Sequence, residues 1–98
     1  MVKSKEEILK KLKNIKKKLK DDYMVESIGL FGSYVTNNQT ATSDIDFLVE
    51  FNEEADLIHF IALSRYLEDI FDANVDIVSK PCLKEELKQN ILNEVIYA

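Results

Sequence analysis

Hydrophobic residues recur along the chain with two different spacings, and these spacings predict helices and strands in turn. An amphipathic helix is predicted over residues 5–21, where Ser4 and Glu7 fit a capping box at the start. Its apolar stripe has residues three or four positions apart, namely Ile8, Leu12, Ile15 and Leu19. Lysines occupy the rest of this segment, so one face of the helix should be solvated.

Two strands are predicted in the first half of the chain. Residues 25–31 are apolar on both faces in their second half, which predicts a central, buried strand. Residues 45–51 alternate, with Ile45, Phe47, Val49 and Phe51 on one face and Asp46, Leu48 and Glu50 on the other. The polar stretch 36–40 between the strands has room for only a short helix and a loop.

The second half predicts a helix, a strand and a helix. Residues 56–71 form the first helix, with a predicted buried face of Leu57, Phe60, Ile61, Leu67 and Phe71. Residues 74–78 form a short strand, and a last helix over 83–93 follows Pro81, before an apolar tail at 95–97. This order predicts one α/β domain over residues 1–98, a two-layer sandwich with a three- or four-stranded mixed sheet.

Composition and charge exclude several classes of protein. The net charge is −5, although residues 1–20 alone carry nine lysines and two glutamates. We therefore do not expect a general nucleic-acid coat, and the basic helix is either a solvated face or a surface for phosphate or an acidic partner. Apolar runs of at most four residues predict neither a membrane span nor a secretory signal. One cysteine, Cys82, and one histidine, His59, rule out an internal disulfide and a four-ligand zinc site, and predict a reducing, cytoplasmic compartment.

Two aspartates stand at the start of the alternating strand. Asp44 and Asp46 are two positions apart, so their side chains should project from the same face, about 6.5–7 Å apart. Two carboxylates at this spacing can flank a hard cation such as Mg²⁺, which keeps waters and phosphates as its other ligands. The alternative is that one or both aspartates cap a turn before the strand.

Two further features favour phosphate chemistry. Gly32 and Ser33 directly follow the buried strand, where a glycine permits close backbone approach and a serine can contribute to an anion pocket. Asp76 lies in the middle of the third strand, where burial would be costly unless the carboxylate is paired or bound to metal; the alternative is a solvent-facing position on an edge strand. Together these residues predict metal-assisted phosphoryl or nucleotidyl transfer.

The combined motif resembles the minimal nucleotidyltransferases (MNT) of the DNA polymerase beta-like superfamily. The resemblance rests on Gly32-Ser33, on residues 43–49 around Asp44 and Asp46, and on residues 75–78 around Asp76. It implies Mg²⁺, a nucleoside triphosphate held at Gly32 and Ser33, and three carboxylates that act as catalytic metal ligands. It also implies the antitoxin role in a pair with a helical HEPN toxin, in which AMP is transferred from ATP to a tyrosine hydroxyl of the toxin.

This chain departs from the family pattern at one position. Many members have an arginine shortly after Gly-Ser, whereas this chain has Thr36. The resemblance therefore leaves two functions open, an active adenylyltransferase and a weak or inactive antitoxin that neutralises its partner by binding alone. A domain this small offers an open half-cleft, which a partner in a homo- or hetero-oligomer would complete.

Overall fold

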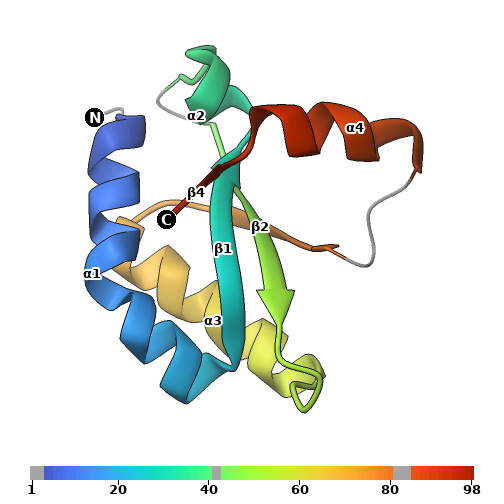
Figure 1. Cartoon of the computed structure of the whole chain (residues 1–98). Helices are drawn as coiled ribbons and strands as arrows, with labels where there is room; N and C mark the ends of the chain where they lie inside the picture. The colour runs from blue at the N-terminus through green and yellow to red at the C-terminus, as the bar shows by residue number, and fades with distance from the viewer. Residues whose placement is uncertain (1–3, 41–42, 81–84) are drawn as a thin grey trace.

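The computed structural model describes residues 4–40, 43–80 and 85–98. The helices are α1 (Lys5–Tyr23), α2 (Ser33–Thr36), α3 (Leu57–Phe71) and α4 (Glu85–Glu94). The strands are β1 (Val25–Phe31), β2 (Ile45–Phe51), β3 (Val75–Ser79) and β4 (Ile96–Tyr97). The predicted order of elements is confirmed, and the apolar tail forms a fourth strand (Figure 1).

The four strands form one mixed sheet in the order β3-β2-β1-β4. β1 runs antiparallel to β2 and to β4, with Gly29 opposite Tyr97, while β2 and β3 run parallel, with Asp46 opposite Asp76. The two apolar strands β1 and β2 therefore occupy the centre, and the more polar β3 and β4 form the edges. The predicted two-layer α/β sandwich with a small mixed sheet is confirmed.

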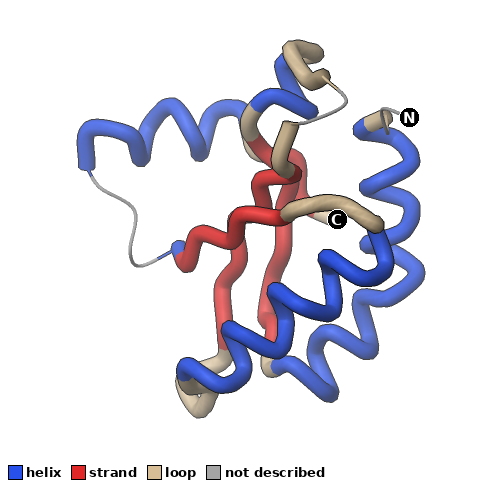
Figure 2. Tube along the Cα trace, turned by 180° about the vertical axis from the view of Figure 1, so that it is seen from behind, coloured by secondary structure: helices blue, strands red, loops and turns tan. Residues whose placement is uncertain are grey.

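Helices α1 and α3 lie side by side over one face of the sheet (Figure 2). The core between these helices and the sheet consists of fully buried aliphatic and aromatic side chains, among them Ile8, Leu12, Leu19, Ile28, Leu30, Phe47, Leu63 and Leu67. The rings of Tyr23 and Tyr66 stack 5.0 Å apart and join the two helices. None of the helices in the described ranges is long and apolar enough to cross a membrane.

Side-chain caps fix where the two long helices begin. The Ser4 hydroxyl accepts a hydrogen bond from the backbone N–H of Glu7 at 3.1 Å, as the predicted capping box requires. The Glu7 carboxylate bonds to the Ser4 hydroxyl at 3.3 Å, whereas a complete capping box would have it bond to the Ser4 backbone N–H. At α3, Asp56 accepts the N–H of His59 at 3.2 Å, while the His59 ring accepts the Asp56 N–H at 3.2 Å. His59, the sole histidine, thus has a structural role at a helix start.

The predicted buried face of α3 is wrong at two positions. Leu57 and Ile61 are 71% and 46% exposed. The inward stripe runs instead through residues that follow one another by three or four, namely Phe60, Leu63, Leu67 and Phe71. The helix carries more apolar residues than one stripe can bury, and the sequence alone does not say which of two adjacent stripes faces the sheet.

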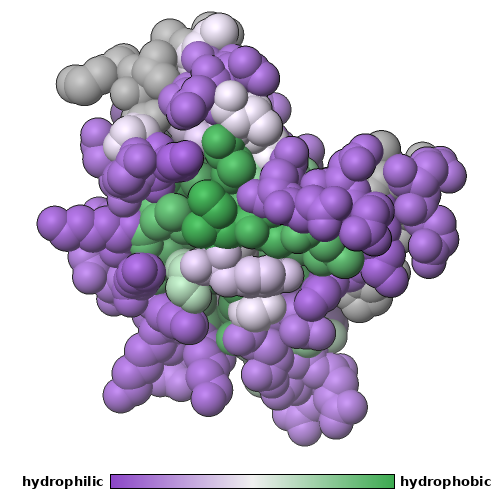
Figure 3. Space-filling model, turned by 45° about the horizontal axis from the view of Figure 1, so that its top comes forward, coloured by the Kyte–Doolittle hydropathy of each residue, from purple (hydrophilic) through white to green (hydrophobic). Residues whose placement is uncertain are grey.

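The C-terminal segment packs closely over β1. A methyl group added at Gly29 would lie 2.5 Å from Cγ2 of Val95 and 3.1 Å from Cδ1 of Tyr97. The predicted helix 83–93 is observed over Glu85–Glu94, and residues 83 and 84, together with Pro81 and Cys82, lie outside the described residues. A band of hydrophobic surface crosses the region of β4 between α1 and α4 (Figure 3).

We expect Gly29→Ala to destabilise the protein by about 1–3 kcal/mol, because the new methyl group must displace Val95 or Tyr97. Urea unfolding followed by circular dichroism measures the change. Ser27→Ala, on the same strand, is the matched control and should change stability far less. Equal stabilities of the two variants would show that β4 does not pack on Gly29 in solution.

Candidate active site at one end of the sheet

The strand directions bring the predicted site residues to one end of the sheet. β1 ends at Phe31, next to the starts of β2 and β3, because β1 runs antiparallel to β2 and β2 runs parallel to β3. Phe31 pairs with Asp46, and Asp46 pairs with Asp76. Gly32, which follows Phe31, therefore lies beside the carboxylates that the sequence predicted.

Gly32 is required both by its own backbone and by its neighbour. Its φ of +80° lies in the region that favours glycine. A Cβ atom at this position would also collide with Oδ2 of Asp46. The group that approaches Gly32 closely is an aspartate carboxylate of the chain itself, and the contact with phosphate stays a prediction.

Glu94, the last residue of α4, also reaches this site. Its Oε1 accepts the backbone N–H of Gly32 at 2.8 Å, in a partly buried contact between residues 62 positions apart. Sequence analysis missed Glu94, because no local pattern links it to Gly32. An acidic residue just before the apolar tail was the only signal, and many surface residues share it.

The turn after Gly32 is short and closes on itself. The carbonyl oxygen of Gly32 accepts the backbone N–H groups of Val35 at 3.0 Å and Thr36 at 3.2 Å. The Thr36 hydroxyl donates to the same oxygen at 3.4 Å. Thr36, which stands where many family members have an arginine, therefore stabilises the turn in this chain. Within the described ranges the hydroxyl of Ser33 has no hydrogen-bond partner, so it is available to a ligand.

Burial and like charges together distinguish Asp46 from the other carboxylates. Its pKa is raised from 3.8 to about 6, first by burial and then by the negative charges of Asp76, Asp44 and Glu94. Among the described residues, no lysine or arginine forms an ion pair with any of these four acids. The described residues of the site therefore concentrate negative charge around a half-buried carboxylate and supply no cation to balance it.

The predicted burial of Asp76 is wrong. Its side chain is exposed, because β3 is an edge strand and Asp76 projects toward solvent at the end of the sheet. The alternative of a solvent-facing edge position is the correct one. The predicted association of the three aspartates does not depend on burial, since the register of β2 and β3 places Asp76 beside Asp46.

The donor set suits a cation that arrives with a ligand. In the part of the chain that the structure describes, no three acidic, histidine or cysteine side chains are close enough to form a complete metal site. Mg²⁺ is commonly held by one or two carboxylates together with waters and substrate phosphates. Asp46 with Asp44 or Asp76 fits that arrangement, and the excess negative charge favours it.

A family model now identifies the chain. The model described as "Nucleotidyltransferase domain" matches residues 12–98. The chain belongs to the nucleotidyltransferase domain family. A relative from Thermococcus cleftensis, named protein adenylyltransferase MntA, is 42% identical over 92 residues, which are 94% of this chain and 93% of that protein.

Solved structures share the fold of this nucleotidyltransferase. One, provisionally described as a minimal nucleotidyltransferase, has a TM-score of 0.78 and 30% identity, with 92% of each chain covered. A toxin–antitoxin structure with AMP-PNP has a TM-score of 0.69 and 30% identity over 86% of this chain and 69% of that one. A tri-AMPylated HEPN toxin in complex with its MNT antitoxin, from Shewanella oneidensis, has a TM-score of 0.63 and 26% identity. The match covers 91% of this chain and 70% of that one.

We expect the contribution of Asp46 to the stability of the metal-free protein to fall as pH rises from about 4 to about 7. The folded-state pKa of Asp46 is about 6, above its ordinary value of 3.8, so the folded state holds a proton that the unfolded state releases. Asp46→Asn removes this loss. Allowing for the partial exposure of the site, the variant should be more stable than wild type by about 1–2 kcal/mol at pH 7.5 and by little near pH 4.

Urea unfolding in EDTA across this pH range measures the difference. Asp21→Asn, at an exposed position of α1, removes the same charge and is the matched control. Its stability should follow the wild-type pH profile. A gap between Asp46→Asn and wild type that stays constant with pH would contradict the raised pKa of Asp46.

Proposed function

We propose that this nucleotidyltransferase is a protein adenylyltransferase that uses Mg²⁺ and ATP to transfer AMP to a tyrosine hydroxyl of a HEPN-type toxin, and so acts as the antitoxin. The observation that carries the proposal is the gathering of Asp44, Asp46 and Asp76 near Gly32, where the described part of the chain places no balancing cation. The relatives named for adenylyl transfer and for AMPylated toxin support the group transferred and the class of acceptor.

The residues of the chain have separable roles in this proposal. Asp44 and Asp46 would hold the cation together with the phosphates, and Asp76, beside Asp46 on the neighbouring strand, would complete the set of carboxylates when cation and nucleotide bind. The hydroxyl of Ser33 would contact the triphosphate, and the backbone N–H of Gly32 would do so once Glu94 releases it. When bound, Mg²⁺ neutralises negative charge on the phosphates and orients them for in-line displacement.

The chemical step joins the tyrosine oxygen to the α-phosphorus of ATP. The bond between the α-phosphorus and its bridging oxygen breaks, and pyrophosphate leaves. The tyrosine proton passes to a carboxylate, and Asp76 is suited to accept it because its exposed side chain borders the open side of the site. A large protein acceptor can reach this end of the sheet, since Asp44 and Asp76 are both exposed.

A second function, neutralisation by contact alone, has one specific observation in its favour. Glu94 occupies the N–H of Gly32 that a phosphate would need, and Thr36 supplies no positive charge nearby. The two functions differ in whether the carboxylates are required for neutralisation.

We expect Asp76→Asn to transfer AMP at least about 100-fold more slowly than wild type while still binding ATP, because a proton acceptor acts mainly in the transition state. Asp44→Asn/Asp46→Asn should abolish transfer. The measurement is intact mass of a HEPN toxin that the wild-type protein neutralises, after co-expression with each variant, together with growth of the host.

The control is Asp21→Asn, which should AMPylate the toxin as wild type does. If every variant restores growth equally at equal protein levels and the toxin never gains mass, contact inhibition replaces the enzymatic function.

We expect Glu94→Ala to bind ATP about three- to tenfold more tightly than wild type. The change frees the N–H of Gly32 and removes a negative charge, and a hydrogen bond of this kind corresponds to about 1 kcal/mol. Calorimetric titration with Mg²⁺ and AMP-PNP measures the affinity, with Glu86→Ala on the exposed start of α4 as the control. Weaker binding by Glu94→Ala would mean that Glu94 holds Gly32 in its binding conformation instead of competing with phosphate.

A further inference from the structure

β4 covers only the second half of the free edge of β1. The two strands pair at Gly29 and Leu30, and the last backbone bond joins the N–H of Ala98 to the carbonyl of Ile28 at 3.0 Å. Val25 and Ser27 pair with β2 on one side, with a register shift at Glu26 between them, and within the described residues no strand lies on the other side of this segment. Such an edge presents backbone groups that another strand can bind.

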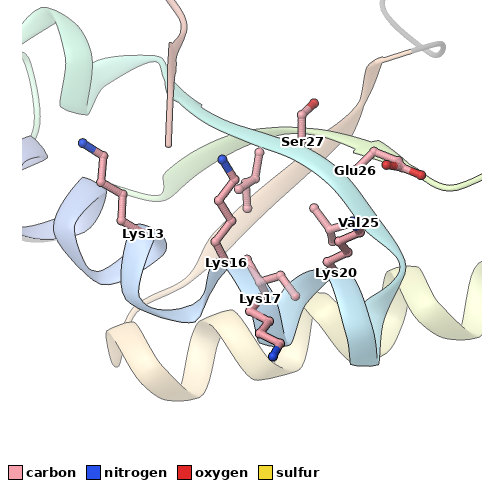
Figure 4. A pocket seen from close by; sticks show the side chains of 9 residues that line it. Lys13, Lys16, Lys17, Lys20, Val25, Glu26 and Ser27 are labelled. Atoms are coloured by element: carbon pink, nitrogen blue, oxygen red, sulfur yellow. The ribbon is translucent and has the colours of Figure 1, made fainter.

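A groove of about 410 Å³ lies between this free edge and α1. Its floor is apolar, because Leu19, Val25 and Ile28 are buried beneath it. Four lysines line it along one side of α1: Lys13, Lys16, Lys17 and Lys20. Lys13 and Lys16 extend toward β1, whereas the ammonium group of Lys17 points away from the strand (Figure 4).

Positive charge exceeds negative charge in the groove: four lysines line it, and among its described lining residues Glu26 alone is acidic, with its carboxylate accepting a hydrogen bond from Asn52 at 2.9 Å. Lys16 donates to the carbonyl oxygen of Ala98 at 3.1 Å, so one lysine already holds the end of an extended strand. Lys13, Lys17 and Lys20 form no ion pair there, in contrast to Lys18, which pairs with Asp22 at 2.9 Å on another side of α1. An occupant with negative charges would complement the groove.

We propose that this groove binds an extended acidic segment of another protein, which adds as a strand to residues 25–27. Alternate side chains of such a strand would point to the apolar floor and to the lysines. The buried apolar floor and the backbone edge favour a peptide over a nucleic acid, whose phosphates would use the lysines alone. The groove lies at the edge of the sheet away from β2 and β3, so its occupant would not compete with a nucleotide.

Fluorescence anisotropy with a labelled short peptide of alternating glutamate and valine, at low salt, tests the proposal on the full chain. We expect saturable binding that Lys13→Gln/Lys16→Gln weakens about tenfold, because each exposed charge contact contributes up to about 1 kcal/mol. Lys11→Gln/Lys18→Gln removes equal charge from the opposite side of α1 and should weaken binding less than about twofold. Circular dichroism of each variant confirms that it is folded.

Two further probes separate strand addition from simple charge attraction. The same peptide with N-methylated valines cannot donate backbone hydrogen bonds and should bind at least about fivefold more weakly. Amide hydrogen exchange at Glu26 should slow when the unmodified peptide is bound. Absence of peptide binding, equal binding of the methylated peptide, equal losses in the two lysine variants, or tighter binding of polyuridylate RNA than of the peptide would overturn the proposal.

Discussion

The half-buried carboxylate of Asp46, held among other acids at one end of a small sheet, is the constraint on which the site depends. Burial first, and then the negative charges of Asp76, Asp44 and Glu94, raise its pKa to about 6. The apolar layer between the sheet and helices α1 and α3 stabilises the fold enough to hold these groups together. A cation would turn the repulsion among these acids into attraction, so stability and ligand binding are linked at the same residues.

The C-terminal segment connects this site to the rest of the molecule. Glu94 ends α4 with a hydrogen bond to Gly32, and the next residues pack over Gly29 as β4. A change at the N–H of Gly32 therefore acts directly on the element that completes the sheet. The exposed side chains of α4 and the apolar band around β4 lie beside the site, where the proposed protein acceptor would approach (Figures 1 and 3).

Much of the fold and of the site could be predicted from local patterns. The alternation of residues 45–51 gave both the strand and the common face of Asp46 and Leu48, and Gly32 was singled out because a close approach needs a residue without a side chain. Burial of Asp76, Leu57 and Ile61 could not be predicted correctly, since it depends on which strand becomes an edge and which helix stripe faces the sheet. Glu94 needed the tertiary structure, because its partner is far away in the sequence.

If the carboxylates and the nucleotide phosphates jointly hold one cation, Mg²⁺ must raise the affinity of the protein for nucleotide. Measuring this affinity with and without Mg²⁺ is the most direct test. Isothermal titration calorimetry would compare AMP-PNP binding in EDTA with binding in saturating Mg²⁺, for wild type and for Asp44→Asn. The account predicts that Mg²⁺ tightens nucleotide binding at least about tenfold in wild type and has little effect in the variant. Equal nucleotide affinity with and without Mg²⁺ in the wild-type protein would contradict it.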